Sequence, residues 1–580
     1  MIYPNGRAID YSYGSGLSNA NAALDQAIGR LDAIVDSANS GDSGQVLEQY
    51  SYLGLSTIVA RNRPQSSVSL VSFVVGSIGA GGDQYVGLDQ LGRVVNQNWV
   101  NASTGASVDN YTYSYDADGN VTAKNNVLDS AYSETYTYDS LNRLTSTARN
   151  GAAYQSWNLD SQGNWSGFTN QGATQTETAN SQNQITSISG QATPTYDANG
   201  NMIGDQNGNT LIYDGWNRLV EVEDSSGQVI ARYTYNAMNY AVTVTYPQGN
   251  SEIPAGTTNY VYYSNQWQVI EVRTGGTSVS DVSTQTVWSA AYVNAAILQD
   301  AYSGGVIEPD SRLYFLQDAN WGTTAVVGYD PSTQTWGVVQ RYVYDSYGNI
   351  TILNADWSAT PTGTAPVVNA LYQGMQYDPI TGLYYGRARW YSPSLGRWIS
   401  QDPAGYVNGA NEYQMEMGGP AGGTDALGLF VYARPYTTVT MVHSGKCPTL
   451  IAVETIYVNY GDIAVPYPDS PGGSLDKVLR AILEGVGKFS GLVGAVDALV
   501  NSLTGNGALA YIWTGWSITT IRTVTTETCT CPPHVTGTTT TRSTAGPFWS
   551  DTDQPAAPDG GAADKAWLES LQSIADEFNK

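Results

Sequence analysis

The sequence predicts an all-β protein, a meander of antiparallel hairpins, and two observations support this prediction. The first is a turn that recurs with Asp or Asn as its first residue: Asp89, Asp116, Asp139, Asp160, Asn180, Asp197, Asp214 and Asn236. The second is the tyrosine alternation before the turn, because Tyr111, Tyr113 and Tyr115 fall on one face of an extended strand. Tyrosine suits a pleated, half-buried surface, so we expect a strand on each side of every turn.

Successive turns are 17 to 27 residues apart, which is enough for two strands and two turns. A glycine or asparagine stands three residues after the start of each turn: Gly92, Gly119, Asn142, Gly163, Asn183, Gly200, Asn217 and Asn239. These residue types tolerate the positive φ that tight hairpin turns require. We therefore predict one regular array over residues 85–340, in place of unrelated hairpins in a β-sandwich.

The first residues of the chain already match the repeat, with Tyr3-Pro-Asn-Gly-Arg7 as a turn and Tyr11-x-Tyr13 as a strand. We assign residues 1–84 to a degenerate repeat segment that begins in the middle of an array. The start has no signal-peptide pattern, and no run approaches the roughly 18 to 20 apolar residues of a membrane helix. We expect a piece of a longer exported chain with its targeting signal upstream; a cytoplasmic protein that starts at Met1 is the alternative.

The composition limits the classes of partner that this chain is expected to bind. The formal net charge of −26 disfavours nucleic-acid and anionic-membrane partners, which need patches of Lys and Arg. Tyrosine supplies 42 residues, against 15 tryptophans and 7 phenylalanines, and only 13% of residues are charged. We expect the tyrosines to stack between neighbouring strands, in a wall with water on each side, while their hydroxyls find hydrogen-bond partners. An exposed tyrosine platform that binds glycan is the alternative.

The repeat Tyr-x-Tyr-Asp-x-x-Gly-Asn/Arg resembles the YD repeat of the RHS/YD family, which includes bacterial Rhs proteins, Tc-toxin C components and teneurins. A longer stretch, YDPITGLYYGRARWYSPSLGRWISQDPAGY at residues 377–406, resembles the RHS-associated core that ends such arrays. The resemblance covers residues 1–429 and assigns residues 341–429 to the core. It implies that the strands coil into a hollow shell, which encloses the polypeptide that follows the core.

The resemblance also implies self-cleavage by two aspartates in Asp-Pro-x-Gly motifs, because two close carboxyl groups can share one proton and act as acid and base. Asp402-Pro-Ala-Gly matches the first motif, and Asp425-Ala-Leu-Gly-Leu matches the second with Ala426 in place of proline. The connection between the motifs is one residue longer than the family pattern, and Gln401 stands where cleaving relatives often carry a basic residue. The expected scissile bond is Leu429–Phe430. A purely structural role for both aspartates is the alternative.

Residues 430–580 form a variable C-terminal region with a different composition, for which we predict a small mixed α/β structure. Apolar residues at spacings of three and four predict an amphipathic helix at about 474–503. The β-branched stretch SITTIRTVTTETCT, residues 517–530, predicts a strand. The threonine-rich TGTTTTRST and the segment DQPAAPDGGAAD are interpreted as linkers before a final helix from about residue 563.

All cysteines and histidines of the chain lie in this region: His443, Cys447, Cys529, Cys531 and His534. Together they could bind zinc, although their spacing is not that of a standard zinc finger. In an exported chain a disulfide from Cys447 to Cys529 or Cys531 is the simpler expectation, and unlinked thiols are a third possibility. No other metal site and no cofactor is predicted.

These observations predict an extracellular or cell-surface RHS/YD-repeat shell, a structural protein that encloses its own C-terminal region. One alternative is a polymorphic-toxin carrier that cleaves itself near Leu429–Phe430 and releases a C-terminal effector. The other is a surface adhesin that binds glycan or protein. In the first two cases the only enzymatic activity would be aspartic-type self-cleavage by Asp402 and Asp425.

Overall fold

The computed structural model describes residues 1–13, 29–37, 44–53, 57–70, 87–89, 91–406, 409–429, 436–444, 447–465, 511–528 and 534–549. The chain divides into two compact units, Met1–Asp89 with Arg93–Tyr432, and Gln90–Gly92 with Ala433–Lys580. The repeat array lies in the first unit and the variable region in the second.

Two large sheets make up most of the first unit, and almost every strand pairs with its neighbour in sequence. The described strands of the first sheet are β1 (Ile9–Ser12), β2 (Ala33–Asp36), β3 (Gln45–Leu53), β4 (Thr57–Arg63), β5 (Val68–Leu70), β6 (Asn96–Asn101), β7 (Ser107–Tyr115), β8 (Val121–Asn126), β9 (Glu134–Tyr138), β10 (Leu144–Arg149), β11 (Ala152–Leu159), β12 (Trp165–Asn170), β13 (Ala173–Ala179) and β14 (Ile185–Ile188). Successive pairs along this sheet are antiparallel, as from β7 to β8.

The second sheet continues the meander. Its described strands are β15 (Thr195–Tyr196), β16 (Met202–Gly204), β17 (Thr210–Tyr213), β18 (Leu219–Glu223), β19 (Val229–Tyr235), β20 (Ala241–Tyr246), β21 (Thr257–Tyr263), β22 (Val269–Thr274), β23 (Val282–Trp288), β24 (Ala296–Ser303), β25 (Val306–Ile307), β26 (Leu313–Gln317), β27 (Thr323–Asp330), β28 (Thr335–Tyr344) and β29 (Ile350–Asn354). Only β25 leaves the path, because it pairs with β24 alone and β24 continues to β26.

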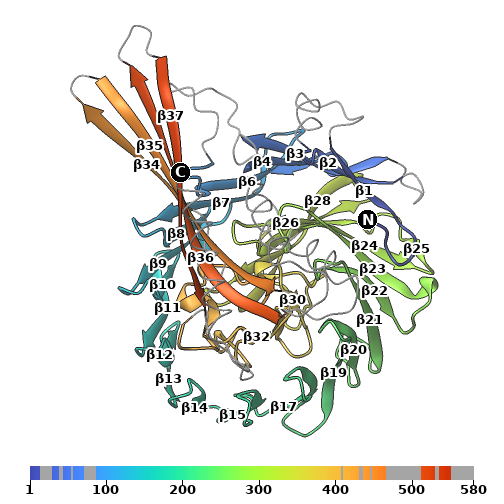
Figure 1. The fold of residues 1–580 in the computed structure, drawn as a ribbon. Helices are drawn as coiled ribbons and strands as arrows, with labels where there is room; N and C mark the ends of the chain where they lie inside the picture. Colours follow the sequence, from blue (N-terminus) through green and yellow to red (C-terminus); the bar gives the residue numbers. More distant parts are fainter. Residues whose placement is uncertain are drawn as a thin grey trace, which may run out of the picture. The chain divides into compact units, whose positions relative to one another are not determined.

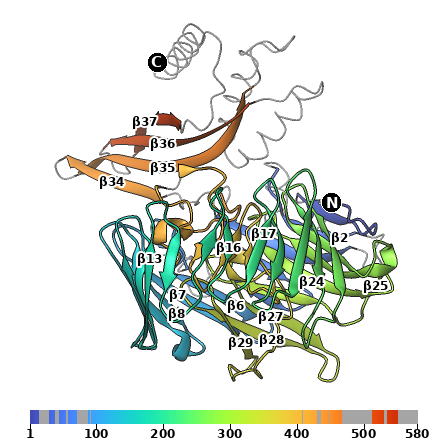
Figure 2. The same ribbon diagram turned by 90° about the horizontal axis from the view of Figure 1, so that it is seen from below.

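Helical structure in the described part of the first unit is limited to short 3-10 turns, which include η1 (Ser130–Tyr132), η2 (Val279–Asp281), η3 (Tyr372–Gly374) and η5 (Met415–Gly418). The predicted antiparallel meander is therefore confirmed. Figures 1 and 2 show the two sheets following one another around a curve, with the short strands β30 (Gln376–Tyr377) and β32 (Trp390–Ser392) inside it.

The repeated turn has one hydrogen-bonding pattern. At Asp116 the backbone N–H donates to the carbonyl of Asn120 (3.0 Å), and Asp116 Oδ1 accepts the N–H of Asn120 (2.8 Å). Gly119 has a φ of +90°. All eight predicted Gly or Asn positions have positive φ, so the turn prediction is confirmed at each of them. Further turns of this kind begin at Asp205, Asp224, Asp318 and Asp345.

The hydroxyl of the tyrosine that precedes a turn forms a hydrogen bond with an earlier turn. This hydroxyl donates to the carbonyl five residues after the start of the earlier turn, in five pairs: Tyr115 to Val94, Tyr138 to Val121, Tyr235 to Leu219, Tyr263 to Ala241 and Tyr344 to Thr323. These bonds measure 2.7 or 2.8 Å. The Tyr-Asp pair therefore joins a strand end to its neighbour and caps the turn that follows.

The side chain that follows each turn extends the connection along the rim. Arg143 pairs with Asp139 of its own turn and donates through Nη1 to the carbonyl of Asp160, the start of the next turn (2.8 Å). Asn120 makes the equivalent link to the side chain of Asn142 (2.9 Å). Consecutive turns are thus joined side by side, which fixes the spacing of the strand ends.

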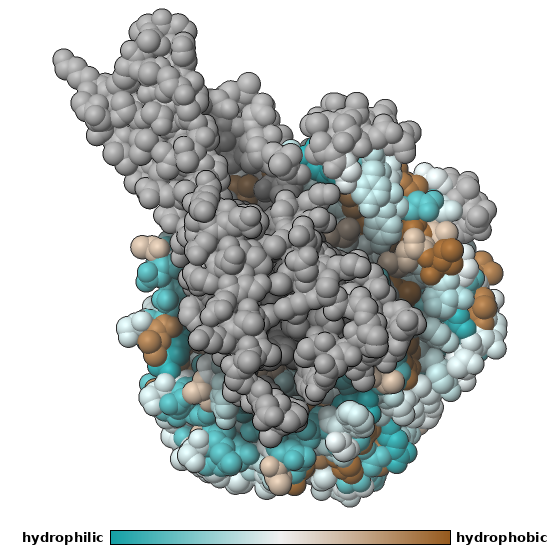
Figure 3. Space-filling view, in the orientation of Figure 1, coloured by the Kyte–Doolittle hydropathy of each residue, from teal (hydrophilic) through white to brown (hydrophobic). Residues whose placement is uncertain are grey.

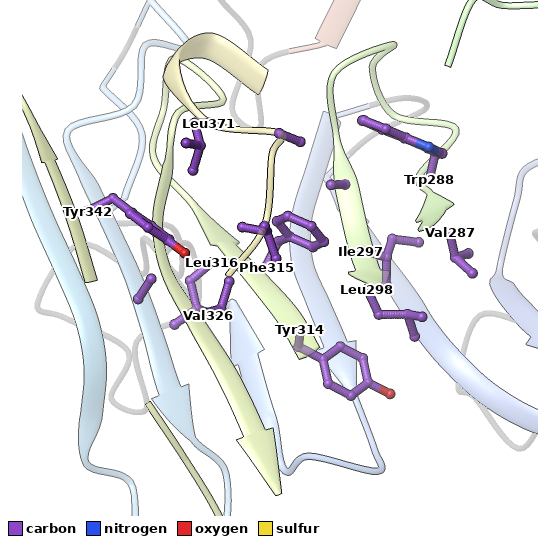
Figure 4. Close-up of a cluster of buried hydrophobic side chains, with 14 of the residues drawn as sticks. Val287, Trp288, Ile297, Leu298, Tyr314, Phe315, Leu316, Val326, Tyr342 and Leu371 are labelled. Atoms are coloured by element: carbon purple, nitrogen blue, oxygen red, sulfur yellow. The ribbon is translucent and has the colours of Figure 1, made fainter. Parts of the chain in front are cut away.

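Burial differs between parts of the array. In β7 the tyrosine row is largely buried while Ser114 is exposed, as the alternation predicts. In β24 and β26 consecutive residues are fully buried, including Tyr314, Phe315 and Leu316, so both faces of the sheet are covered there (Figure 4). The expectation of water on each side of the whole wall is therefore wrong at these strands. Elsewhere, the outer wall seen in Figure 3 mixes hydrophilic residues with isolated hydrophobic ones.

The second unit contains a four-stranded antiparallel sheet, β34 (Tyr436–Ser444), β35 (Cys447–Val465), β36 (Tyr511–Thr528) and β37 (His534–Trp549). β36 contains most of the predicted strand at residues 517–530. The linker interpretation of TGTTTTRST is wrong, because these residues belong to β37; their β-branched side chains favour an extended chain. The predicted helices at 474–503 and from 563, and the second linker, lie outside the described residues.

Candidate active site

The candidate site lies in the closing segment, which we define as residues 370–406 and 409–429. This segment contains β30, β31 (Tyr384–Tyr385), β32 and β33 (Arg397–Trp398), a small antiparallel sheet, and it runs along the tips of the array turns. Its turn contacts come from sequence-distant positions: Asn320 to the Ala421 carbonyl, Asn183 to the Ala410 carbonyl, Tyr413 to the Gly200 carbonyl, and Asn411 to the Gln162 carbonyl. The ring of turns therefore fixes the course of the segment.

Asp402 and Asp425 meet at one guanidinium group. Arg389 Nη2 lies 2.9 Å from Asp402 Oδ2 and 3.5 Å from Asp425 Oδ2. All three side chains are only 1 to 2% exposed. The two predicted site residues, 23 positions apart in the chain, thus share a buried site with a cation that the sequence analysis did not identify.

The guanidinium group of Arg389 contacts an aromatic ring and two backbone carbonyls in addition to the two aspartates. It lies over the ring of Trp398, 4.4 Å from the centroid. Nη1 donates to the carbonyl of Glu412 (2.8 Å), and Nε donates to the carbonyl of Gly428 (2.5 Å). Burial lowers the pKa of Arg389, and the negative charges of the two aspartates oppose that shift. The arginine is therefore positioned by five groups and has little freedom to move.

Hydrogen bonds hold each of the residues 426–429, which follow Asp425. Four contacts hold them: Arg387 Nη1 to the Ala426 carbonyl, Ala388 N–H to the Leu427 carbonyl (3.1 Å), Arg389 Nε to the Gly428 carbonyl, and Leu429 N–H to Asp425 Oδ1 (3.1 Å). Gly428 has a φ of +65°, and a Cβ there would lie 2.6 Å from the Gly386 carbonyl oxygen. Only glycine fits this close approach without a shift of the chain.

Each aspartate uses its two oxygens differently. Asp402 Oδ1 accepts the N–H of Ala404 (2.9 Å), which caps the local turn, while Oδ2 faces Arg389. Asp425 Oδ1 accepts the N–H of Leu429, while Oδ2 faces Arg389. The structural and the catalytic role are therefore compatible, because turn capping occupies one oxygen of each carboxyl group and leaves the other at the shared site.

Two of the three departures from the family motif, Ala426 and Gln401, are accommodated. Ala426, in place of proline, is 1% exposed and its carbonyl is bound by Arg387. Gln401 packs against the turn at Gly200, whose Cβ position would lie 2.6 Å from Gln401 Cδ. Neither residue prevents the aspartates from reaching Arg389.

The site also contains an acid that the sequence analysis missed. Glu416 in η5 is 4% exposed, and the negative charge of Asp425 acts on its carboxyl group. No local pattern marks Glu416 or Arg389. Arg387 and Arg389 stand two residues apart in GRARW, in the connection between β31 and β32, where Arg387 has a φ of +68°. This spacing does not show which acids they meet.

A family model described as the teneurin YD-shell matches residues 102–417. The chain belongs to this family. The resemblance inferred from the Tyr-Asp repeats is therefore confirmed, and the array described above is a YD-shell.

Two relatives of this YD-shell are named as toxins. Double-stranded DNA deaminase toxin A of Burkholderia cenocepacia (strain H111) is 26% identical over 246 residues, which are 40% of this chain and 16% of the toxin. Toxin subunit YenC2 of Yersinia entomophaga is 37% identical over 92 residues, 16% of this chain and 9% of the subunit. The chain thus spans less than a fifth of either relative.

Solved structures show the same fold. A Tc holotoxin pore of Photorhabdus luminescens that carries a mutated TccC3 superposes with a TM-score of 0.56 at 19% identity, over 74% of this chain and 20% of that one. A complex of TcdB2 and TccC3 without the hypervariable C-terminal region gives 0.53 at 20% identity, over 69% of this chain and 20% of that one. The YD-shell therefore has the architecture of a Tc-toxin shell.

The tyrosine row that suggested a glycan-binding platform is directed into the core at three positions in β7 and β9. Tyr111, Tyr113 and Tyr136 are buried, and Tyr136 donates its hydroxyl to Glu134 (2.6 Å). Rings that are buried and hydrogen-bonded have no face to offer a ligand, so these three tyrosines do not support the adhesin alternative.

The cysteine and histidine predictions remain untested. The structure describes the strands that carry His443, Cys447 and His534, but Cys529 and Cys531 lie outside the described residues. Within the described ranges, no group of three His, Cys, Asp or Glu side chains is placed to hold a metal ion. No helix in the described part of the chain is long and apolar enough to cross a membrane.

Proposed function

We propose that this YD-shell encloses residues 430–580 of its own chain, as the carrier portion of an exported polymorphic-toxin-type protein, and cleaves the chain at Leu429–Phe430. The observation that carries the cleavage is the position of Arg389, which contacts both aspartates and the carbonyl of Gly428. Two acids, a cation and the peptide segment before the expected scissile bond therefore share one buried site.

The chemistry follows from two carboxyl groups that share one proton. The ionised aspartate takes a proton from a water molecule, whose oxygen attacks the carbonyl carbon of Leu429. The protonated aspartate gives its proton to the nitrogen of Phe430, and the C–N bond breaks. The products are a new carboxyl group on Leu429 and a new amino group on Phe430, so one water is consumed and the proton shared by the aspartates is restored.

Arg389 and the hydrogen bonds along residues 426–429 position the aspartates and the peptide segment for the reaction. The cation favours a state in which one of the two neighbouring aspartates is ionised. The contacts along residues 426–429 hold the peptide segment in place before reaction, which removes much of the entropic cost of bringing reactants together. This supports an intramolecular reaction that depends on a closed YD-shell and proceeds once per chain.

Enclosure is supported by the curved path of the two sheets and by the similarity to Tc-toxin shells. An extracellular destination is supported by the relatives that are named as toxins.

The test of cleavage uses the full chain on a denaturing gel. Release of residues 430–580 gives a fragment of about 16 kDa, scaled from 62.0 kDa for 580 residues. Asp402→Asn keeps the turn cap through its side-chain oxygen and should abolish the fragment. Asp224→Asn is the matched control, because Asp224 caps an array turn in the same way outside the site. A fragment that persists in Asp402→Asn would contradict the assignment.

Enclosure has a separate test. The native chain is treated with a protease of broad specificity and then analysed on a denaturing gel. If the YD-shell encloses residues 430–580, these residues survive in the native chain and are digested after heating. Equal rates of digestion before and after heating would refute enclosure while leaving the cleavage result unaffected.

A further inference from the structure

Glu416 occupies a strained position in η5. Its φ is +48°, and that of Met417 is +53°, so two consecutive side chains other than glycine adopt the left-handed region. Such conformations are costly and persist where the surroundings enforce them, often at functional sites. The strain turns the Glu416 side chain inward, where it is 4% exposed.

The pocket around the Glu416 carboxyl group is tight and provides little compensation. Neither of its oxygens forms a hydrogen bond of good geometry within the described residues, although the Gln373 side chain and the Asp425 backbone lie close enough to favour its charged form. Among the ion pairs of the described residues, none involves Glu416. A Cβ on Gly423 would lie 2.9 Å from Glu416 Oε2, so the backbone at residue 423 passes close to the carboxyl group. A buried carboxylate without a partner is unfavourable, and a carboxyl group in its neutral form is tolerated.

The titratable groups that face Glu416 come from several elements. Asp425 and the rings of Tyr347, Tyr372 and Tyr391 interact with its charge. One basic residue lies near η5: the side chain of Arg143 is close to Gly418, and its guanidinium forms an ion pair with Asp139. The surroundings of Glu416 are therefore one acid and three phenols.

These surroundings determine the direction of the pKa shift. Burial raises the pKa of Glu416 well above its ordinary value, and the charge of Asp425 raises it further, although Gln373 and the backbone of Asp425 oppose the shift. Glu416 therefore stays uncharged to a higher pH than an ordinary glutamate does. Once ionised, it would add a further negative charge beside Asp425, at a site whose cations are Arg389 and Arg387.

We propose that Glu416 is a positioning residue of the site, which holds Asp425 in place only while its own carboxyl group is uncharged. This proposal rests on the self-cleavage proposed above and adds a pH limit to it. An ionised Glu416 is repelled by Asp425 and draws water toward a pocket that has no room for it. The segment from η5 to Asp425 then shifts, and the contact between Asp425 and Arg389 is lost.

The test compares the wild-type chain with Glu416→Gln, which keeps the shape of the side chain and cannot ionise. The full chain, isolated in denaturant before cleavage, is diluted into buffers of increasing pH, and the rate of fragment release is followed on a denaturing gel. We expect both chains to share the acid limit. On the alkaline side the wild-type rate falls about tenfold per pH unit as Glu416 ionises, while Glu416→Gln stays active to higher pH. Glu308→Gln is the control, because Glu308 is exposed and distant in sequence from the site.

A second measurement is independent of cleavage. In an Asp402→Asn background, thermal unfolding is compared with and without Glu416→Gln. A glutamate whose pKa is raised in the folded state destabilises the fold as pH rises from its unfolded value through its folded value. We therefore expect equal stability at acid pH and a more stable Glu416→Gln chain at alkaline pH.

Coincident alkaline limits, or no difference in stability at any pH, would overturn the role of Glu416 while leaving self-cleavage intact. A wild-type chain that releases no fragment at any pH would overturn the self-cleavage proposal itself, and the role of Glu416 with it.

Discussion

Tyr138 provides the sharpest test of how the YD-shell is held together. Its hydroxyl donates to the carbonyl of Val121 (2.7 Å), and its ring packs in a cluster with Tyr136, Leu144 and Trp157. Burial raises the pKa of Tyr138, whose side chain is half-buried. Tyr138→Phe removes the inter-turn bond alone, whereas Tyr138→Ala removes the bond and the ring.

The two substitutions should differ by a predictable amount. Loss of the bond and of a partner for the Val121 carbonyl costs about 1 to 2 kcal/mol. Removal of a buried aromatic ring costs about 3 to 5 kcal/mol. Tyr113 is buried and should fall within this range, and the half-buried Tyr138 should fall at its lower end. If the unit of about 430 residues unfolds cooperatively, its entropy of unfolding is near 0.9 kcal/mol/K, so these costs lower Tm by about 1 to 2 °C and about 3 to 5 °C.

Differential scanning calorimetry on the Asp402→Asn chain measures these shifts without interference from cleavage. Tyr13→Phe is the control, because Tyr13 is exposed and its hydroxyl joins no pair of turns described above. If Tyr138→Ala leaves Tm unchanged, the ring does not stabilise the sheet and the structural role is refuted. If Tyr138→Phe is as damaging as Tyr138→Ala, the hydroxyl and not the ring dominates.

Three further predictions concern the site, one buried acid and the variable region. Gly428→Ala should slow cleavage about a hundredfold, because the new Cβ collides with the Gly386 carbonyl and displaces the segment before the scissile bond. Gly363→Ala is the control and should cleave normally, because Gly363 also has a positive φ but has no neighbour within 4 Å of the Cβ position. Equal cleavage rates of the two variants on a gel would contradict the positioning argument. Burial raises the pKa of Asp109 to about 6, although the positive charge of Arg341 opposes this shift. The free energy of unfolding should therefore fall by up to about 3 kcal/mol as pH rises from about 4 to about 6. If the denaturation midpoints of the wild-type and Asp109→Asn chains change in the same way over this range, the carboxyl group of Asp109 is ionised in the folded state. Intact-mass analysis with and without reductant should show Cys447 linked to Cys529 or Cys531, whereas one zinc per chain in elemental analysis would contradict the disulfide.

Sequence reasoning succeeded where the interactions are local. The turns at Asp116 and its counterparts are held by bonds between residues two to four positions apart, so the residue types at those positions were sufficient to find them. The turns at Asp205 and Asp224 carry the same Asp-x-x-Gly signal at shorter spacing and were missed. The turn at Asp318 has Trp321 at the position with positive φ, which no residue preference would suggest.

The errors arose where the sheet context outweighed the local composition. A threonine-rich stretch suggests a linker because its residues are small and polar, yet in β37 it pairs along the length of β36. Consecutive buried residues in β24 and β26 likewise depend on what covers the second face of the sheet. Neither property is encoded within a window of a few residues.

The sequence by itself determined the antiparallel meander and most of its turns, because these depend on short patterns with their own physical preference. The two aspartates of the candidate site were inferred from the resemblance to the RHS/YD family. Only the tertiary structure decided that Asp402 and Asp425 meet at Arg389 and that a buried Glu416 interacts with the charge of Asp425. The closing segment is held by turn tips that lie up to 249 positions away in the chain, as Asn411 is by Gln162. Those contacts exist only once the whole array has curved around the segment, so the site is a property of the assembled YD-shell.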